Sequence, residues 1–201
     1  MSHQLFKEDI LFYQRFLKAN GYYKKKLDGI WGKNTDAADM AFLEESNAIA
    51  TKYGRFDART EGNIMTLAPK AQVLARQFMN IVTKGRDVRI ISGTRTYAEQ
   101  NALYRKGRYG NKENKVTNAR GGRSNHNFGI AWDIGLFDNG KYVTQGSKYK
   151  QVAPLALPEL PDLEWGGSWK SFPDFPHYQQ KAISDSVAVI RNAFENGKAY
   201  V

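Results

Sequence analysis

The sequence predicts an α+β protein, in which a small N-terminal helical module is followed by an α+β domain with a short antiparallel sheet. Apolar residues recur at helical spacing near both ends of the chain and over residues 67–82. Residues 87–92 and 129–137 instead have the patterns of strands. Hydrophobic residues make up 41% of the 201 residues and charged residues 25%, which is the composition of a folded chain and not of a disordered one.

The domain boundary is expected where polar residues replace the periodic pattern. Residues 47–66 are polar and show no clear period. We therefore place the module in residues 1–50, a linker in residues 51–60 and the second domain in residues 61–201.

Two helices and a turn define the expected module. The apolar face of the first helix consists of Phe6, Ile10, Tyr13 and Leu17. Asn20-Gly21 ends this helix, and Asn34 or Thr35 caps the second one. The buried side of the second helix is expected to carry Ala38, Ala41 and Phe42. A module of this size has a small core, so Trp31 and Phe42 are expected to supply much of its packing.

The second domain begins with a longer helix from Leu67. Its expected buried positions are Ala71, Leu74, Ala75, Phe78, Ile81 and Val82. DVRIIS at 87–92 predicts a strand, and EQNALYRKG predicts a short helix after it. The last helix is expected to have a core stripe of Ile183, Val187, Ile190 and Phe194.

A second strand is predicted over residues 129–137. One face carries Ile130, Trp132, Ile134 and Leu136, and the other carries Ala131, Asp133 and Gly135. The small side chains beside Asp133 would leave space for a metal and a substrate. Asn139-Gly140 is expected to form the turn of a hairpin.

The charge balance favours an anionic partner. The chain carries a net charge of +10, and residues 84–123 hold eleven basic and three acidic residues, a net charge of +8. The alternative is a solvated glycine-rich loop whose charge aids solubility. Nucleic acid is not expected as the partner, because the segment has no recognised nucleic-acid motif and few interleaved aromatic residues.

Several classes of protein are excluded by composition. The chain has no cysteine, which excludes disulfide scaffolds, iron–sulfur clusters and thiol chemistry. No stretch approaches the roughly 20 apolar residues of a membrane span. The N-terminus carries charges where a signal peptide would have its apolar segment, so we expect a protein made in the cytoplasm without a signal peptide.

Two of the three histidines lie in distinctive surroundings; His3, the third, is at a terminus where order is not expected. A catalytic zinc needs three protein ligands and a nearby carboxylate that accepts a proton from water. His126 and Asp133 are seven residues apart, and His177 could supply a third ligand with Asp174 three residues before it. The alternative is that each of these residues has an ordinary structural role.

A longer motif around these residues resembles a known family. Ser124-x-His126-x-x-Gly129-x-Ala131-x-Asp133 matches the signature of zinc peptidases that include D-alanyl-D-alanine carboxypeptidases, D,D-dipeptidases and phage L-alanyl-D-glutamate endopeptidases. The block from Glu164-Trp165-Gly166-Gly167 to Asp174-Phe175-Pro176-His177 resembles the endopeptidase branch, as does Ser92-Gly93-Thr94-Arg95 with Glu99-Gln100. The similarity covers roughly residues 61–180.

The resemblance implies one zinc ion bound by His126, Asp133 and His177. It further implies that Asp174 is the general base and that Arg95 binds the scissile carbonyl. Substrate contacts are expected from Ser124, Gln100 and Trp169. Glu164 is the competing candidate for the base, but Asp174 has the closer spacing to the last histidine and is favoured.

The N-terminal residues have a resemblance of their own. The stretch from Leu17 through Asp28-Gly29-Ile30-Trp31-Gly32 to Thr35, Ala38 and Phe42 resembles a peptidoglycan-binding module of three helices. Asp28 can close an Asx-turn, and Gly29 and Gly32 tolerate positive φ. Asp28, Trp31 and Thr35 are candidates for glycan contact, although most residues of the motif are needed for the fold alone.

Taken together, these patterns lead us to expect a phage-type endolysin that cleaves the L-alanyl–D-glutamate bond of peptidoglycan stem peptides. Such a protein would act on the cell wall after release by a membrane-permeabilising partner, as a monomer, with electrostatic contact to anionic envelope polymers. One alternative is a D,D- or L,D-carboxypeptidase that trims the stem peptide. Another is a non-catalytic wall-binding protein.

Overall fold

The computed structural model describes residues 6–110 and 112–201, so His3 lies outside the described residues. Its longer helices are α1 (Lys7–Ala19), α2 (Lys33–Tyr53), α3 (Ala58–Ile64), α4 (Pro69–Val82), α5 (Tyr97–Arg105) and α8 (Val187–Glu195). Short helical turns are η1 (Asn125–Phe128), α6 (Gly146–Tyr149), α7 (Ala153–Ala156) and η2 (Gly166–Ser168). The strands are β1 (Asp87–Ser92), β2 (Ala131–Asp138), β3 (Lys141–Tyr142), β4 (Leu163–Trp165) and β5 (His177–Gln180). Helices with a small antiparallel sheet confirm the predicted α+β class.

The described chain divides into two compact units. One comprises the chain up to Glu45 together with Arg95–Phe128 and Ala182–Tyr200. The other comprises Ser46–Thr94 and Gly129–Lys181. The first is helical, and the second contains the sheet.

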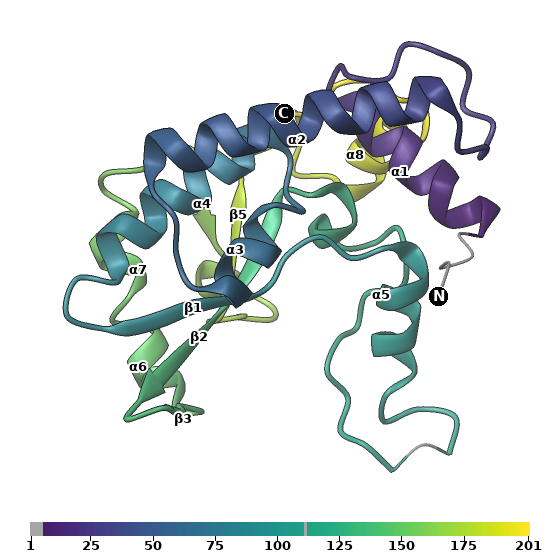
Figure 1. Cartoon of the computed structure of the whole chain (residues 1–201). Helices are drawn as coiled ribbons and strands as arrows, with labels where there is room; N and C mark the ends of the chain where they lie inside the picture. The colour runs from purple at the N-terminus through teal and green to yellow at the C-terminus, as the bar shows by residue number, and fades with distance from the viewer. Residues whose placement is uncertain (1–5, 111) are drawn as a thin grey trace. The chain divides into compact units, whose positions relative to one another are not determined.

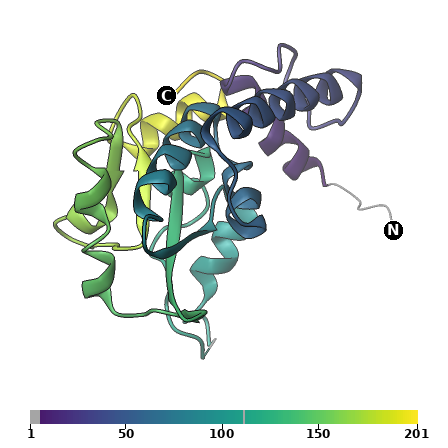
Figure 2. The ribbon, with the colours of Figure 1, turned by 60° about the vertical axis from the view of Figure 1, so that its left-hand side comes forward.

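The sheet of the second unit has the order β1-β2-β5-β4, and β3 also pairs with β2. All pairs are antiparallel, and β1 and β2 run side by side along most of their length (Figures 1 and 2). The predicted hairpin turn is present, because Phe137 pairs with Tyr142 across Asn139 and Gly140. Both turn residues have positive φ, at 49° and 75°, as the tight primed turns require.

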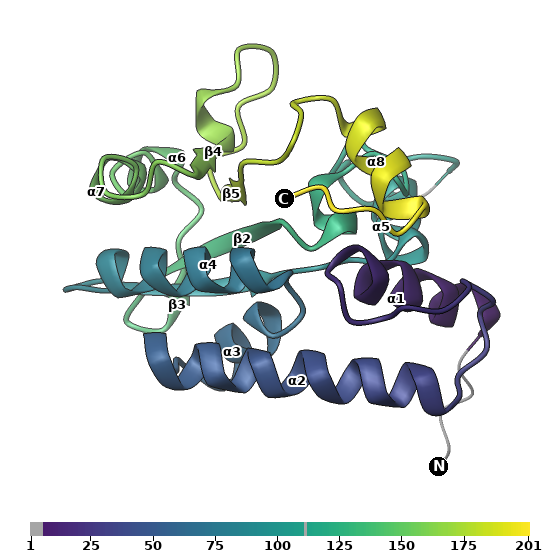
Figure 3. The ribbon, with the colours of Figure 1, turned by 90° about the horizontal axis from the view of Figure 1, so that it is seen from above.

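Helix α4 covers one face of this sheet (Figure 3). Phe78 on α4 contacts Trp132 on β2 and Tyr178 on β5, with ring centroids 6.0 and 4.5 Å apart. All three side chains are fully buried. Trp132 and Tyr178 are cross-strand partners, so they share this face, and residues next to them in sequence point to the opposite face.

Aromatic side chains form the core of the helical unit. Phe194 on α8 packs against Phe12, Phe128 and Tyr200 at centroid distances of 5.3 to 6.1 Å. The Tyr200 hydroxyl donates a hydrogen bond to the Phe128 carbonyl. These contacts hold α1, α8 and η1 together within the unit.

A buried glutamine organises the turn after α1. Gln14 Oε1 accepts hydrogen bonds from the backbone N–H groups of Asp28 and Gly29, at 3.1 and 2.9 Å. Its Nε2 donates to Asp28 Oδ1 and to the Ile30 carbonyl, at 2.9 and 3.0 Å. The D-G-x-x-G turn is thereby held by one side chain from the preceding helix, and Asp28 closes the expected Asx-turn onto the Ile30 N–H.

The structure differs from the prediction in the module's second helix. Helix α2 continues to Tyr53, although the sequence favoured irregular chain from residue 47. Ile49 and Ala50 are buried, and Ser46 accepts a hydrogen bond from Gln72, so packing extends the helix through a polar stretch. Ala41 was placed on the buried side but is exposed, whereas Phe42 is buried as predicted.

Trp31 and Ile183 contribute less to the core than predicted. Trp31 is 36% exposed and stacks on Tyr13 at a centroid distance of 5.9 Å. Ile183 is 59% exposed and precedes α8, which begins only at Val187. Ser184-Asp185-Ser186 favours a turn over a helix, and the Ile183 N–H instead donates to the Tyr200 carbonyl.

The predicted basic segment, residues 84–123, contains β1 and α5 and continues as loop. Residues 106–110 and 112–124, which follow α5, contain no helix or strand (Figure 1). Two of its arginines lie over the Tyr104 ring, with Arg108 and Arg120 at 4.1 and 4.9 Å from the ring centroid. None of the helices in the described ranges has both the length and the apolar character needed to cross a membrane.

Candidate metal centre

Asp133 and His177 face each other on adjacent strands. Asp133 on β2 is the cross-strand partner of His177 on β5. His177 Nδ1 lies 3.3 Å from Asp133 Oδ1, and the histidine is 5% exposed. Because Trp132 and Tyr178 occupy the face covered by α4, strand alternation puts this pair on the other face.

The small residues beside Asp133 do not both have the role expected of them. A side chain at Gly135 would meet Ile91, Phe137 and Tyr142 at 3.0 to 3.1 Å. The space at Gly135 is therefore filled by packing and is not available to a substrate. The prediction for the other face holds, because Trp132 and Ile134 are fully buried.

His126 is held by backbone contacts on both sides of its turn. Its carbonyl accepts a hydrogen bond from the Arg95 N–H at 3.0 Å. The next residue, Asn127, is buried, donates through Nδ2 to the Arg95 carbonyl at 2.8 Å and accepts from the Gly122 N–H at 2.9 Å. Ser124 contributes its carbonyl, which accepts from the Asn127 N–H at 2.9 Å.

His126, Asp133 and His177 offer a group of potential metal ligands. One ligand atom from each residue lies within 4.8 Å of the other two. Imidazole nitrogens and carboxylate oxygens are donors that zinc accepts, and three protein donors leave a coordination position for water. The donor set therefore fits a catalytic divalent metal, and zinc in particular.

The surroundings of His177 favour a cation. Burial lowers the pKa of His177. This effect is outweighed by the hydrogen bond and negative charge of Asp133, the hydrogen bond to Gln179 and the negative charge of Asp174. The pKa of His177 is therefore above its ordinary value of 6.5. A bound metal would replace the proton that these groups attract.

Asp174 precedes His177 in a tight turn that also involves Gly166. The Asp174 carbonyl accepts from the His177 N–H at 3.3 Å, and the Asp174 N–H donates to the Gly166 carbonyl at 3.0 Å. A side chain at Gly166 would lie 2.8 Å from the Asp174 carbonyl oxygen and 3.0 Å from His177 Cβ. Trp169 lies against the same histidine, with its ring 4.9 Å from the imidazole and 38% of its surface exposed.

Arg95 lies in the turn after β1 and is positioned by Gln100. Arg95 Nε donates to Gln100 Oε1 at 2.9 Å, and Gln100 Nε2 donates to the Ala119 carbonyl at 2.9 Å. Gln100 was expected to contact substrate, but its side chain is fully buried and its amide bonds to the protein. The geometry makes it a support for Arg95.

Comparisons with known proteins give a consistent result. Residues 117–180 match the family model described as D-alanyl-D-alanine carboxypeptidase. The chain is 39% identical over 104 residues to the peptidoglycan L-alanyl-D-glutamate endopeptidase CwlK of Bacillus subtilis (strain 168), a match that covers 48% of this chain and 62% of CwlK. Among solved structures, it is similar to the L-Ala D-Glu endopeptidase ChiX of Serratia marcescens, with a TM-score of 0.50 and 27% identity over 65% of this chain and 92% of the ChiX chain.

These matches make the chain similar to the D-alanyl-D-alanine carboxypeptidase and L-alanyl-D-glutamate endopeptidase family. The resemblance predicted from the sequence is thus confirmed. The stretch that matches the family model contains His126, Asp133, Asp174 and His177, whereas Arg95 and Gln100 precede it.

Gln179 contacts His177 and was missed by the sequence analysis. Its Oε1 lies 2.9 Å from His177 Nε2, and its Nε2 donates to Glu164 Oε2 at 2.6 Å. Alternation along His177-Tyr178-Gln179 would have placed it beside His177, had a strand been predicted there. Glu164, the competing candidate for the base, is engaged by this amide.

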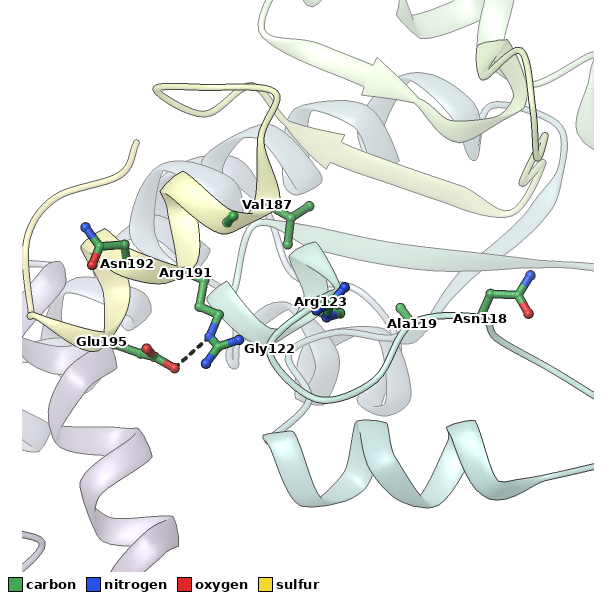
Figure 4. A pocket seen from close by; sticks show the side chains of 9 residues that line it. Asn118, Ala119, Gly122, Arg123, Val187, Arg191, Asn192 and Glu195 are labelled. Carbon is green, nitrogen blue, oxygen red and sulfur yellow. Dashed lines mark hydrogen bonds and ion pairs between the residues drawn. The ribbon is translucent and has the colours of Figure 1, made fainter. Parts of the chain in front are cut away.

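The basic segment borders a surface hollow of about 670 Å³ in the helical unit (Figure 4). Gly122 and Arg123 line it from the segment, and Arg191 and Glu195 line it from α8. Arg191 Nε donates to Glu195 Oε1 at 2.9 Å, the contact drawn in Figure 4. A side chain at Gly122 would lie 3.2 Å from Arg191, so the glycine lets this arginine lie close to the loop.

Proposed function

We propose that this chain is a zinc-dependent peptidase that hydrolyses the L-alanyl–D-glutamate bond of peptidoglycan stem peptides. The group of His126, Asp133 and His177 is the observation that carries the proposal. CwlK and ChiX, both L-alanyl-D-glutamate endopeptidases, support the choice of bond. The chain spans 62% of the length of CwlK, so the transfer of activity from that relative is part of the proposal.

His126, Asp133 and His177 would hold the zinc. When bound, zinc polarises a carbonyl group and lowers the pKa of water to near 7. Asp174 is proposed to accept a proton from the attacking water and to deliver it to the leaving amine as the C–N bond breaks. Arg95, whose Nε is held by Gln100, would stabilise the negative charge that develops on the carbonyl oxygen.

The decisive experiment is digestion of purified peptidoglycan, followed by mass spectrometry of the released peptides. Cleavage should produce new D-glutamate amino termini. It should stop when a chelator removes the metal and when Asp174→Asn removes the base. If Asp174→Asn keeps the zinc content of the wild type, its loss of cleavage is due to loss of the base and not to loss of the metal.

A second candidate is carboxypeptidase activity on the same stem peptide, which the description of the matching family model favours. Loss of only a terminal D-alanine in the digestion would select this reaction. Wall binding without cleavage would select a non-catalytic wall-binding protein.

We further propose that the chain is a monomeric, phage-type endolysin whose residues 1–50 bind peptidoglycan. The turn held by Gln14 and the exposed Trp31 stacked on Tyr13 support a glycan-binding surface there. Trp31→Ala should lower the fraction of protein that co-sediments with purified sacculi and should leave cleavage of a soluble stem peptide unchanged. Expression in a bacterial host should cause lysis only after the inner membrane is permeabilised.

A further inference from the structure

Glu164, Gln179 and His177 form a chain of contacts on one face of the sheet. Gln179 is two residues from His177 on β5, and its cross-strand partner on β4 is Glu164. Both glutamine contacts are at hydrogen-bond distance, 2.9 Å to His177 Nε2 and 2.6 Å to Glu164 Oε2. Gln179 is 8% exposed, so water has little access to compete for its amide.

The carboxylate of Glu164 fixes the orientation of the Gln179 amide. Gln179 Nε2 donates to Glu164 Oε2, so the amide presents its NH₂ group to Glu164. The amide oxygen is then turned towards His177. The opposite orientation would bring the amide oxygen within 2.6 Å of a carboxylate oxygen, with no hydrogen between them.

This orientation in turn selects one tautomer of His177. An amide oxygen accepts but does not donate, so His177 Nε2 must carry the hydrogen. In the neutral imidazole the lone pair is then on Nδ1. Nδ1 is the nitrogen that lies 3.3 Å from Asp133 Oδ1, on the side of the other proposed metal ligand.

We propose that Gln179 and Glu164 are positioning residues that hold His177 in the tautomer that binds zinc through Nδ1. The inference rests on the proposed zinc-dependent function. It assigns Glu164 a structural task in place of proton transfer. Outer hydrogen-bond partners of metal-binding histidines typically contribute about 10- to 100-fold in metal affinity, and this sets the scale of the expected effect.

The first test measures zinc affinity by competition with a chromogenic chelator. Gln179→Ala should weaken zinc binding about 10- to 100-fold. Gln180→Ala is the matched control, because Gln180 is also 8% exposed and adjacent on β5, but strand alternation puts it on the opposite face. Zinc affinity of Gln180→Ala should equal that of the wild type, with folding of both variants checked by circular dichroism.

The second test swaps the side chains at positions 164 and 179. Glu164→Gln alone removes the carboxylate that fixes the amide, so zinc affinity should fall, whereas Glu159→Gln at an exposed position should have no effect. The double variant Glu164→Gln, Gln179→Glu restores an acceptor for His177 Nε2 and a donor at position 164. Its zinc affinity should recover towards the wild-type value.

Long-range ¹H–¹⁵N spectra of the metal-free protein report the tautomer directly. The wild type should show the hydrogen of the neutral His177 imidazole on Nε2, and Gln179→Ala should show a mixture of tautomers. Unchanged zinc affinity and an unchanged tautomer in Gln179→Ala would overturn the inference. A wild-type protein that binds no zinc would instead contradict the proposed function itself.

Discussion

Gln100 makes polar contacts on two sides from a fully buried position. It accepts from Arg95 Nε and donates to the Ala119 carbonyl, both at 2.9 Å. Leucine has a similar volume but no hydrogen-bonding atoms. In Gln100→Leu both partners would therefore lose a hydrogen bond, at a cost of about 0.5–1.5 kcal/mol for each bond.

We expect Gln100→Leu to lower kcat/KM for stem-peptide hydrolysis about 10- to 100-fold while zinc content stays unchanged. The reason is that a displaced guanidinium no longer meets the developing charge, and small misplacements near a reacting group have effects of this size. Steady-state kinetics and metal analysis of the same preparations provide the measurement. Ala98→Ser, at an exposed position of α5, is the control. A variant with wild-type kcat/KM would show that Arg95 does not depend on Gln100.

The turn between β4 and β5 depends on a glycine with no free space. The β-carbon of Gly166→Ala would meet the Asp174 carbonyl and His177 Cβ. We expect this variant to lose about 1–3 kcal/mol of unfolding free energy and to bind zinc more weakly, because the segment with Asp174 and His177 must move. Urea unfolding and chelator competition measure the two effects.

Gly62→Ala is the matched control for this substitution. Gly62 is exposed within α3, and an added β-carbon would have no neighbour within 4 Å. Alanine favours the helix and restricts the unfolded chain, so this variant should gain about 0.4–1 kcal/mol. Equal destabilisation by both substitutions would contradict the steric explanation.

Helices α3 and α4 are joined by a buried ion pair. Arg76 on α4 has no exposed side-chain surface and donates to both carboxylate oxygens of Glu61 on α3, at 2.8 and 3.0 Å. Burial raises the pKa of Glu61, but hydrogen bonds from Arg76 and the Phe56 N–H and the charges of Arg76 and Arg55 outweigh it. The pKa of Glu61 is therefore below its ordinary value of 4.5.

A lowered folded-state pKa means that this stabilisation is present above pH 4.5 and is lost as pH falls through the folded-state value. We expect the unfolding free energy to decrease below pH 4.5 in the wild type and to decrease less in Glu61→Gln. At pH 7, Glu61→Ala should lose about 3–5 kcal/mol, because it leaves Arg76 buried without its partner. Urea unfolding across this pH range measures both effects, with exposed Glu44→Gln as the control.

Elements with a regular apolar pattern were predictable from the sequence, and those fixed by distant contacts were not. Residues 87–92 form β1 at the predicted bounds, and α4 ends at Val82 as expected. In contrast, β5 has only four residues, and its identity depends on pairing with β2 and β4. The prediction of His177 came from a motif and not from a strand, so its neighbour Gln179 was missed.

At the scale of the whole molecule, the charge is concentrated in one part of the chain. Residues 84–123 hold a net charge of +8 out of the total of +10. Arg123, at the end of this segment, lines the hollow together with Arg191 of α8. Lys112 and Lys115 in the loop of this segment are exposed. Exposed cationic groups attract anionic polymers over about one Debye length, which shrinks from about 30 Å at 0.01 M salt to about 8 Å at 0.15 M.

We therefore expect activity on whole cell envelopes to fall steeply between these salt concentrations, while hydrolysis of a small soluble stem peptide changes little. Lys112→Gln, Lys115→Gln should flatten the salt dependence on envelopes, because it removes two charges from the basic loop. Lys141→Gln, Lys148→Gln removes the same charge from exposed positions outside the basic loop and the proposed wall-binding module, and should keep the wild-type slope. A flat wild-type profile, or equal slopes for the two double variants, would show that the basic loop does not guide the protein to the envelope.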